Sequence, residues 1–293
     1  FQPATCSVYL QGTTGTFKSA AAGVLQGFWG PKFDGASLPA NWSSTANALE
    51  KTAFLAKDCL LVVDDFVARG TRQEVAYLHR KAEGLFRAQG NQSGRSRLTA
   101  KLEVRNAFHP RGMILATGED VPNGHSLQAR LVIVNVARGA IDTSVLSQLQ
   151  KLARSGHLAT IMASFVQWLA AEAKEDKLTE FIEMALECDH KNIGSGGHAR
   201  TQDNLANLLT GLRIFLDFAE DAGVMNSSRV QGFMDSATDA ARSLAAMQAS
   251  MDQEASDAQR FIDLIRVAVS SGKAHIESKF GGEPENPRTL GWR

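Results

Sequence analysis

A lysine and a serine, Lys18-Ser19, follow a loop of small residues and precede an alanine-rich stretch. This order suits a phosphate chain, because loop N–H groups surround the β-phosphate, the lysine neutralises β- and γ-oxygens, and the serine hydroxyl binds Mg²⁺. The usual spacing G-x-x-x-x-G-K-[ST] has glycine just before the lysine, where this chain has Phe17. A Gly/Thr-rich turn without a ligand is the alternative for the loop alone. The predicted nucleotide-binding residues are Gly12, Thr13, Thr14, Gly15, Thr16, Phe17, Lys18 and Ser19.

Two aspartates, Asp64 and Asp65, end the apolar stretch CLLVVDDF. The stretch predicts a buried central strand with acids at its carboxyl end, where open α/β sheets place their ligands. Hydrolysis of a nucleoside triphosphate uses one carboxylate to hold Mg²⁺ and another to orient or activate the attacking water. We assign Asp64 to the metal, together with Ser19, and Asp65 to the water. The alternative is that the pair merely begins a solvated loop.

Two more candidates lie at the ends of later apolar runs. Thr117 follows the run Met113-Ile114-Leu115-Ala116, and its hydroxyl is placed to bond the attacking water or the γ-phosphate. Arg130 directly precedes the β-branched run from Leu131 to Val134. An arginine in that place can complete a neighbouring subunit's site, since an arginine supplied in trans stabilises charge on the transferring phosphoryl group. A surface arginine at a strand start is the alternative.

The segment from Arg87 to Arg111 is basic, with Glu103 as its single acid. Glycines around Arg95 predict an exposed loop or hairpin tip, followed by an alternating strand over residues 98–105. An exposed basic hairpin beside an ATP site can grip a phosphate backbone, although a solvated surface loop is equally consistent with the pattern. The predicted DNA-binding residues are Arg95, Arg97 and Lys101.

The composition limits what these residues can belong to. The chain has 293 residues, 44% of them hydrophobic, and a formal net charge of zero, so a nucleic acid would have to bind a local patch. Three cysteines without a CxxC pair favour a reducing, cytoplasmic location. No apolar run approaches the roughly 20 residues of a membrane span, so we expect no membrane partner. The first residues read as the edge of a strand, which suggests a segment of a longer polypeptide.

Helices and strands alternate in the first half of the chain. The sequence predicts a helix from Lys18 to about Phe28, a short strand within residues 36–42, a helix capped by Ser43 or Ser44, and another from Gly70 to Ala88. From Ile141 onward the three-four apolar spacing predicts helix after helix. We therefore expect an α/β core over residues 1–140, an all-α domain over residues 141–280, and a tail over residues 281–293.

Five stretches of this chain carry a resemblance to a known family: LQGTTGTFKSA, LPANWSSTANALEKTAFLAKDCLLVVDDF, RAQGNQSGRS, RGMILATGED and SLQARLVIVNV. The series, from Ser7 to Val136, resembles the helicase-like P-loop ATPases of bacteria, phages and integrated elements, which are mainly catalogued as a domain of unknown function. Those proteins are similar to AAA+ replicative helicases of the minichromosome-maintenance kind and to superfamily-three helicases.

The resemblance implies an AAA+-like P-loop NTPase core with a parallel-rich central sheet, followed by a helical lid. It also implies a hexameric ring of identical subunits with ATP and Mg²⁺ between them, a basic hairpin facing single-stranded or forked DNA, and an arginine acting in trans at Arg130. A lid arginine that reaches the γ-phosphate would be Arg200, with Arg213 as second choice. Relatives continue beyond residue 281 into a further small module.

Two classes of function follow. The first is an ATP-driven DNA motor, such as a helicase of a phage or mobile element. The second is a switch that binds ATP, assembles and recruits partners without moving on DNA. A P-loop small-molecule kinase is disfavoured, because no arginine-rich lid of the expected kind lies between the two strands that carry the site. DNA-stimulated ATP turnover would separate the motor from the switch.

Overall fold

The computed structural model describes residues 4–94, 97–98, 104–105, 108–173, 177–194, 198–277, 281 and 286–290, with only the backbone for 97–98, 104–105, 125–126, 177, 252–259 and 288. The chain divides into two compact units, Phe1–Ala246 and Met247–Arg293. None of the helices in this described part combines the length and the apolar character that a membrane crossing requires.

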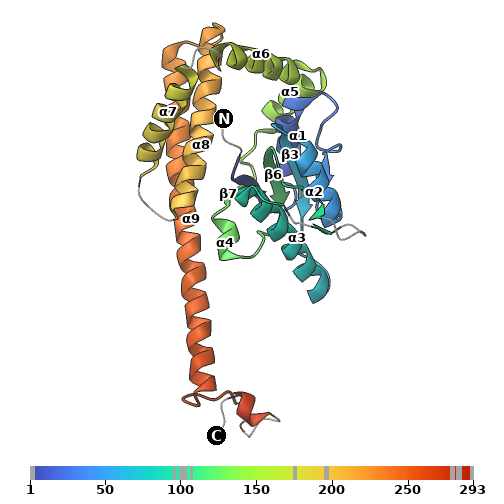
Figure 1. Ribbon diagram of the computed structural model, residues 1–293, viewed down its shortest axis with the longest axis vertical. Helices are drawn as coiled ribbons and strands as arrows, with labels where there is room; N and C mark the ends of the chain where they lie inside the picture. The colour runs from blue at the N-terminus through green and yellow to red at the C-terminus, as the bar shows by residue number, and fades with distance from the viewer. Residues whose placement is uncertain are drawn as a thin grey trace. The chain divides into compact units, whose positions relative to one another are not determined.

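The first unit is built around a sheet of five strands that all run parallel, in the order β2-β3-β6-β1-β7 (Figure 1). The strands are β1 (Ser7–Gln11), β2 (Ala40–Asn41), β3 (Leu60–Phe66), β6 (Met113–Gly118) and β7 (Leu131–Asn135). Strands β1, β3, β6 and β7 were predicted from their apolar runs and β2 as a short strand within residues 36–42, and the α/β prediction is confirmed. Because β1 lies between β6 and β7, and β3 lies on the other side of β6, the chain segments that leave β1, β3 and β6 emerge side by side.

Side chains alternate between the two faces of the sheet, as strand geometry requires. Leu61 and Val63 join a core that helices α2 (Ala46–Leu55), α3 (Arg72–Asn91) and α4 (His125–Gln128) cover with residues such as Leu49, Phe86 and Leu127. Val62 faces the other side, where it packs with Ala22 of α1 (Lys18–Gln26). A 3₁₀ turn, η1 (Gly27–Trp29), extends α1 to the end that the sequence predicts.

Two helix starts differ in how they are capped. The side chain of Thr45, not Ser43 or Ser44 as predicted, caps α2 by accepting the N–H of Ala48 at 3.3 Å. Thr71 and Glu74 form a capping box at the start of α3, in which each side chain accepts a backbone N–H of the other residue. The box fixes the point where the chain leaves β3 and enters α3.

Two short strands, β4 (Arg97–Leu98) and β5 (Val104–Arg105), pair antiparallel between α3 and β6. Leu98 and the pair Val104–Arg105 therefore belong to strands of opposite direction and not to one strand over residues 98–105, as predicted; residues 99–103 lie outside the described residues. Arg97 pairs with Arg105 in the backbone register. Arg95 and Lys101, the other two predicted DNA-binding residues, lie outside the described residues.

The rest of the first unit is helical, as the sequence predicts: α5 (Thr143–Arg154), α6 (His157–Glu172), α7 (Lys177–Ile193), α8 (Ala199–Asp221) and the first part of α9 (Ser227–Ser270). Helix α5 packs on α1 through Leu146 and Val24. Helix α8 packs on the sheet through Leu205 and Val132. The domain boundary predicted at residue 140 stays a prediction.

The second unit contains the remainder of α9 and a short 3₁₀ helix, η3 (Pro287–Leu290). The backbone N–H of Ile276 donates to the carbonyl of Leu290 at 2.9 Å, which ties the segment after α9 to η3.

Candidate active site

A cavity of about 500 Å³ lies at the carboxyl ends of the central strands. It is lined by four parts of the chain: the loop after β1 and the start of α1, the ends of β3 and β6, the segment from Asp34 to Ala36, and the last turns of α5. The predicted residues among its lining are Thr14, Gly15, Phe17, Lys18, Ser19, Asp65 and Thr117. Residues as far apart in the sequence as Thr14 and Thr117 therefore line the same cavity, as the sequence predicts.

The loop from Gly12 to Phe17 is shaped by two unusual backbone positions. A Cβ atom on Gly12 would lie 2.5 Å from the carbonyl oxygen of Val136, so only glycine fits there. Phe17 has φ 62° and ψ 21°, a left-handed conformation that glycine adopts more easily than phenylalanine. No side chain caps the start of α1, so the first-turn N–H groups of this helix remain available beside the cavity.

The conformation of Phe17 leads to a stability prediction. We expect Phe17→Gly to be more stable than Phe17→Ala by about 0.5–1 kcal/mol, because the left-handed penalty of alanine exceeds the unfolded-state entropy that glycine adds. Both variants lose the aromatic ring, so their difference isolates the backbone. Urea unfolding of the two proteins measures it, and a more stable alanine variant would contradict the left-handed assignment.

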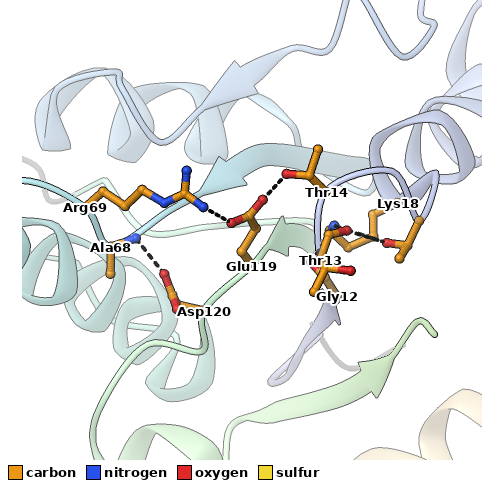
Figure 2. Close-up of polar contacts among 9 residues, drawn as sticks. Gly12, Thr13, Thr14, Lys18, Ala68, Arg69, Glu119 and Asp120 are labelled. Carbon is orange, nitrogen blue, oxygen red and sulfur yellow. Dashed lines mark hydrogen bonds and ion pairs between the residues drawn. The ribbon is translucent and has the colours of Figure 1, made fainter. Parts of the chain in front are cut away.

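Lys18 points its ammonium group back into the loop (Figure 2). Its Nζ donates to the carbonyl oxygens of Gly12 and Thr13, at 2.6 and 3.0 Å, and to the Thr16 hydroxyl at 3.2 Å. The side chain is buried, with 8% of its surface exposed. The loop therefore encloses a positive charge next to the positive end of α1, and this combination favours an anion.

A β-bulge places the two aspartates. Val63 pairs with Ala116 and Phe66 with Gly118, so Asp64 and Asp65 together oppose the single residue Thr117. The Thr117 hydroxyl donates to Oδ1 of Asp64 at 2.5 Å and accepts the backbone N–H of Asp65 at 3.2 Å. Asp65 has φ 67°, so its backbone turns at the bulge and its side chain is exposed at the cavity.

The role predicted for Thr117 needs correction in one respect. A hydroxyl has one hydrogen to donate, and the structure gives that hydrogen to Asp64. Thr117 therefore holds the aspartate pair in position, and it has no free hydrogen to donate to the γ-phosphate in this arrangement. A bond that it accepts from the attacking water stays a prediction.

Two predicted arginines lie away from the cavity. Arg130 directly precedes β7, so it lies at the amino ends of the strands. A strand of five residues is about 16 Å long, and the cavity lies at its other end. The pKa of Arg130 is lowered by partial burial and by the charges of Arg200 and Arg87, so these three arginines lie near one another. Arg200 is held there because α8 docks on the chain before β7, where Asn204 donates to the carbonyl of Ala129. Arg200 therefore does not line the cavity of its own subunit, and its predicted contact with a γ-phosphate stays a prediction.

The second choice, Arg213, belongs to a buried ion pair. Its guanidinium lies 2.6 Å from Oδ1 of Asp189 on α7, a carboxylate with no exposed surface that also accepts from Thr210. We expect Arg213→Ala to lower the free energy of unfolding by about 3 kcal/mol, because it leaves a buried charge without its counterion. Adding Asp189→Asn should restore part of the loss in urea unfolding. A single variant as stable as the wild type would contradict this ion pair.

Sequence reasoning missed four cavity-lining residues that have polar or charged side chains. Glu119 directly follows β6, so its position as an acid just after a predicted strand could have identified it as a site residue. Asp34, Gln150 and Arg154 come from segments that carried no recognisable motif. Asp34 and Arg154 lie 3.7 Å apart as an ion pair, which joins the loop after α1 to the end of α5.

Residues 4–101 match a family model described as a domain of unknown function, DUF927. The matched segment is about a third of the chain and runs from before β1 to beyond β4, so it contains Lys18, Ser19 and both aspartates but not Thr117, Glu119 or Arg130. A comparison with curated proteins found no match. The resemblance to a domain of unknown function is confirmed for this segment, and the relation to helicases stays a prediction.

Proposed function

We propose that the chain is a Mg²⁺-dependent ATPase of the P-loop, AAA+-like type that acts as a DNA motor of a phage or mobile element. The observation that carries the ATPase part is the convergence on one cavity of the Lys18 loop, the uncapped start of α1 and Asp65, which the bulge at the end of β3 exposes. A cation, a helix start and paired carboxylates at the carboxyl ends of one parallel sheet are what phosphoryl transfer to water requires.

The residues present suit Mg²⁺ and a triphosphate. Mg²⁺ prefers oxygen ligands and is usually held by one or two carboxylates together with substrate phosphates. Asp64 offers a carboxylate that Thr117 orients, and the half-buried Ser19 offers a hydroxyl at the start of α1. When bound, the ion neutralises charge on the β- and γ-oxygens. Lys18 and the first N–H groups of α1 bind the same phosphates, and a carboxylate at the cavity orients the water.

The DNA part of the proposal rests on the basic segment between α3 and β6. The antiparallel pairing of β4 and β5 supports a hairpin that carries Arg97. The ring part rests on Arg130, which lies too far from its own cavity to act there and needs the cavity of a second subunit. The alternative proposal, a switch that binds ATP and recruits partners, differs in needing no DNA.

Single-stranded DNA is expected to stimulate ATP turnover by the purified chain. Replacing Arg95 and Arg97 with alanine should weaken DNA binding and flatten its salt dependence by about one to two units of slope, because two phosphate contacts are lost. Phosphate release and fluorescence anisotropy at several salt concentrations measure both effects. The matched control, Arg229→Ala with Arg260→Ala, removes two exposed arginines of α9. ATP turnover that does not increase when DNA is added would favour the switch. A salt slope of the double variant equal to that of the wild type would exclude the hairpin as a DNA-binding site.

A further inference from the structure

Glu119 is fixed at the centre of the candidate site by its backbone. The carbonyl oxygen of the preceding Gly118 accepts the N–H of Gly12 at 3.1 Å, at the start of the lysine-bearing loop. The N–H of Glu119 itself donates to the carbonyl of Phe66 at 3.0 Å, at the end of β3. Glu119 therefore lies between the loop and the aspartate bulge, and its place relative to both is set by these two bonds.

The carboxylate of Glu119 is also held on both sides (Figure 2). The Thr14 hydroxyl, from the loop, donates to Oε1, and the Arg69 guanidinium donates to Oε2 at 2.6 Å. About a fifth of the side chain is exposed, whereas Arg69 is largely exposed. The hydrogen bond from Thr14 lowers the pKa of Glu119, and the charges of Arg69 and Lys18 lower it further. The group is therefore an ionised carboxylate at neutral pH.

Asp65, the acid assigned to the water from the sequence, is less constrained. Within the described residues its hydrogen bonding consists of its backbone N–H to Thr117, and its carboxylate is exposed. A catalytic group contributes most when it is already ordered before the reaction, since then no orientation has to be acquired on the way to the transition state. By this measure Glu119 is better ordered for catalysis than Asp65; both line the cavity, together with Asp34, which pairs with Arg154.

We propose that Glu119, rather than Asp65, is the catalytic carboxylate that orients the attacking water; this inference rests on the ATPase activity proposed above. Each carboxylate oxygen has two acceptor sites, so Thr14 and Arg69 leave room for a water hydrogen. The water oxygen forms the new bond to the γ-phosphorus, and the bond from that phosphorus to the bridging oxygen breaks with its electron pair left on ADP. The water proton passes to Glu119 and from there to solvent.

The test compares two isosteric variants of the full chain. Glu119→Gln keeps the shape and one acceptor oxygen but loses the charge, so kcat should fall by about 10²-fold or more while the Kd for ATP changes by less than about threefold. Asp65→Asn should lower kcat by less than about tenfold. Phosphate release gives kcat, and binding of a fluorescent ATP analogue gives Kd. Glu187→Gln, which removes an exposed acid of α7 paired with Lys191, is the control for loss of a surface carboxylate.

A second pair of variants separates catalysis from folding. Thr14→Val removes the hydroxyl that holds Glu119 while leaving the side-chain volume almost unchanged, so kcat should fall about tenfold. Thr14→Ser keeps the hydroxyl, so kcat should be retained. Full turnover by Glu119→Gln, or equal losses in Glu119→Gln and Asp65→Asn, would overturn the inference. An increase in Kd for Glu119→Gln with kcat retained would also overturn it, because it would show a purely structural role. A wild-type chain that releases no phosphate would instead contradict the ATPase proposal itself.

Discussion

Lys18→Ala is expected to abolish ATP hydrolysis, by at least about 10³-fold in kcat, and to weaken ATP binding. The ammonium group lies inside the loop on the oxygens of Gly12, Thr13 and Thr16, at the start of α1. Alanine removes the charge from the place where the β- and γ-phosphates would bind, and no backbone N–H can replace it. Phosphate release at saturating ATP measures the loss.

The control for this variant has to separate charge from folding. Lys57→Ala removes a largely exposed lysine that pairs only with Asp58 in the salt bridges of the described residues, so it should turn over ATP like the wild type. Lys18→Ala also leaves two loop carbonyl groups without their donor, so circular dichroism must show that the variant is folded. A folded Lys18→Ala protein with unchanged turnover would show that the loop from Gly12 to Ser19 is not part of the ATPase site.

Arg130→Ala is expected to spare ATP binding and to lower turnover by about 10³-fold. Arg130 lies at the amino ends of the strands, where it donates to Oδ1 of Asn91 and lies near Arg87 and Arg200. Like charges gathered in this way are stabilised when an anion binds to them. A neighbouring subunit's γ-phosphate would be such an anion, and its charge would be stabilised mainly in the transition state.

Mixing two inactive proteins tests whether Arg130 acts in trans. The Lys18→Ala protein retains Arg130, and the Arg130→Ala protein retains the intact loop with Lys18. Mixed oligomers therefore contain some complete sites and should recover part of the activity. If mixed oligomers form and the activity stays as low as in either protein alone, Arg130 has a structural role at the start of β7.

The parts of the site that sequence predicts well are those set by local patterns. The run Val8-Tyr9-Leu10, the loop and Lys18 are contiguous, so one stretch of sequence contains the strand, the turn and the helix start. The strand that carries Asp64 is similarly local, because a short apolar run that ends in two acids specifies both the buried strand and its polar end.

The parts that sequence missed depend on contacts between distant residues. The bulge at Asp64 and Asp65 arises because both residues lie opposite Thr117 on the neighbouring strand, 53 residues from Asp64. The sequence of β3 alone does not indicate which residue of β6 will lie opposite them. Arg200 was assigned from a resemblance, but the packing of α8 on β7 carries it away from the cavity. Arg154 reaches the cavity because α5 packs on α1, which local apolar spacing does not specify.

Hydrogen exchange of the full chain with Mg²⁺ and a non-hydrolysable ATP analogue tests the central claim most directly. If the cavity binds the triphosphate, amide exchange should slow in residues 12–20, where N–H groups of the loop and of the first turn of α1 would bond phosphate oxygens. Smaller protection is expected in residues 64–69 and 117–119, because Asp65 and the three residues Thr117, Gly118 and Glu119 line the same cavity. The same analogue should protect none of these segments in Lys18→Ala. Protection confined to other segments, with residues 12–20 exchanging as they do without nucleotide, would contradict this site.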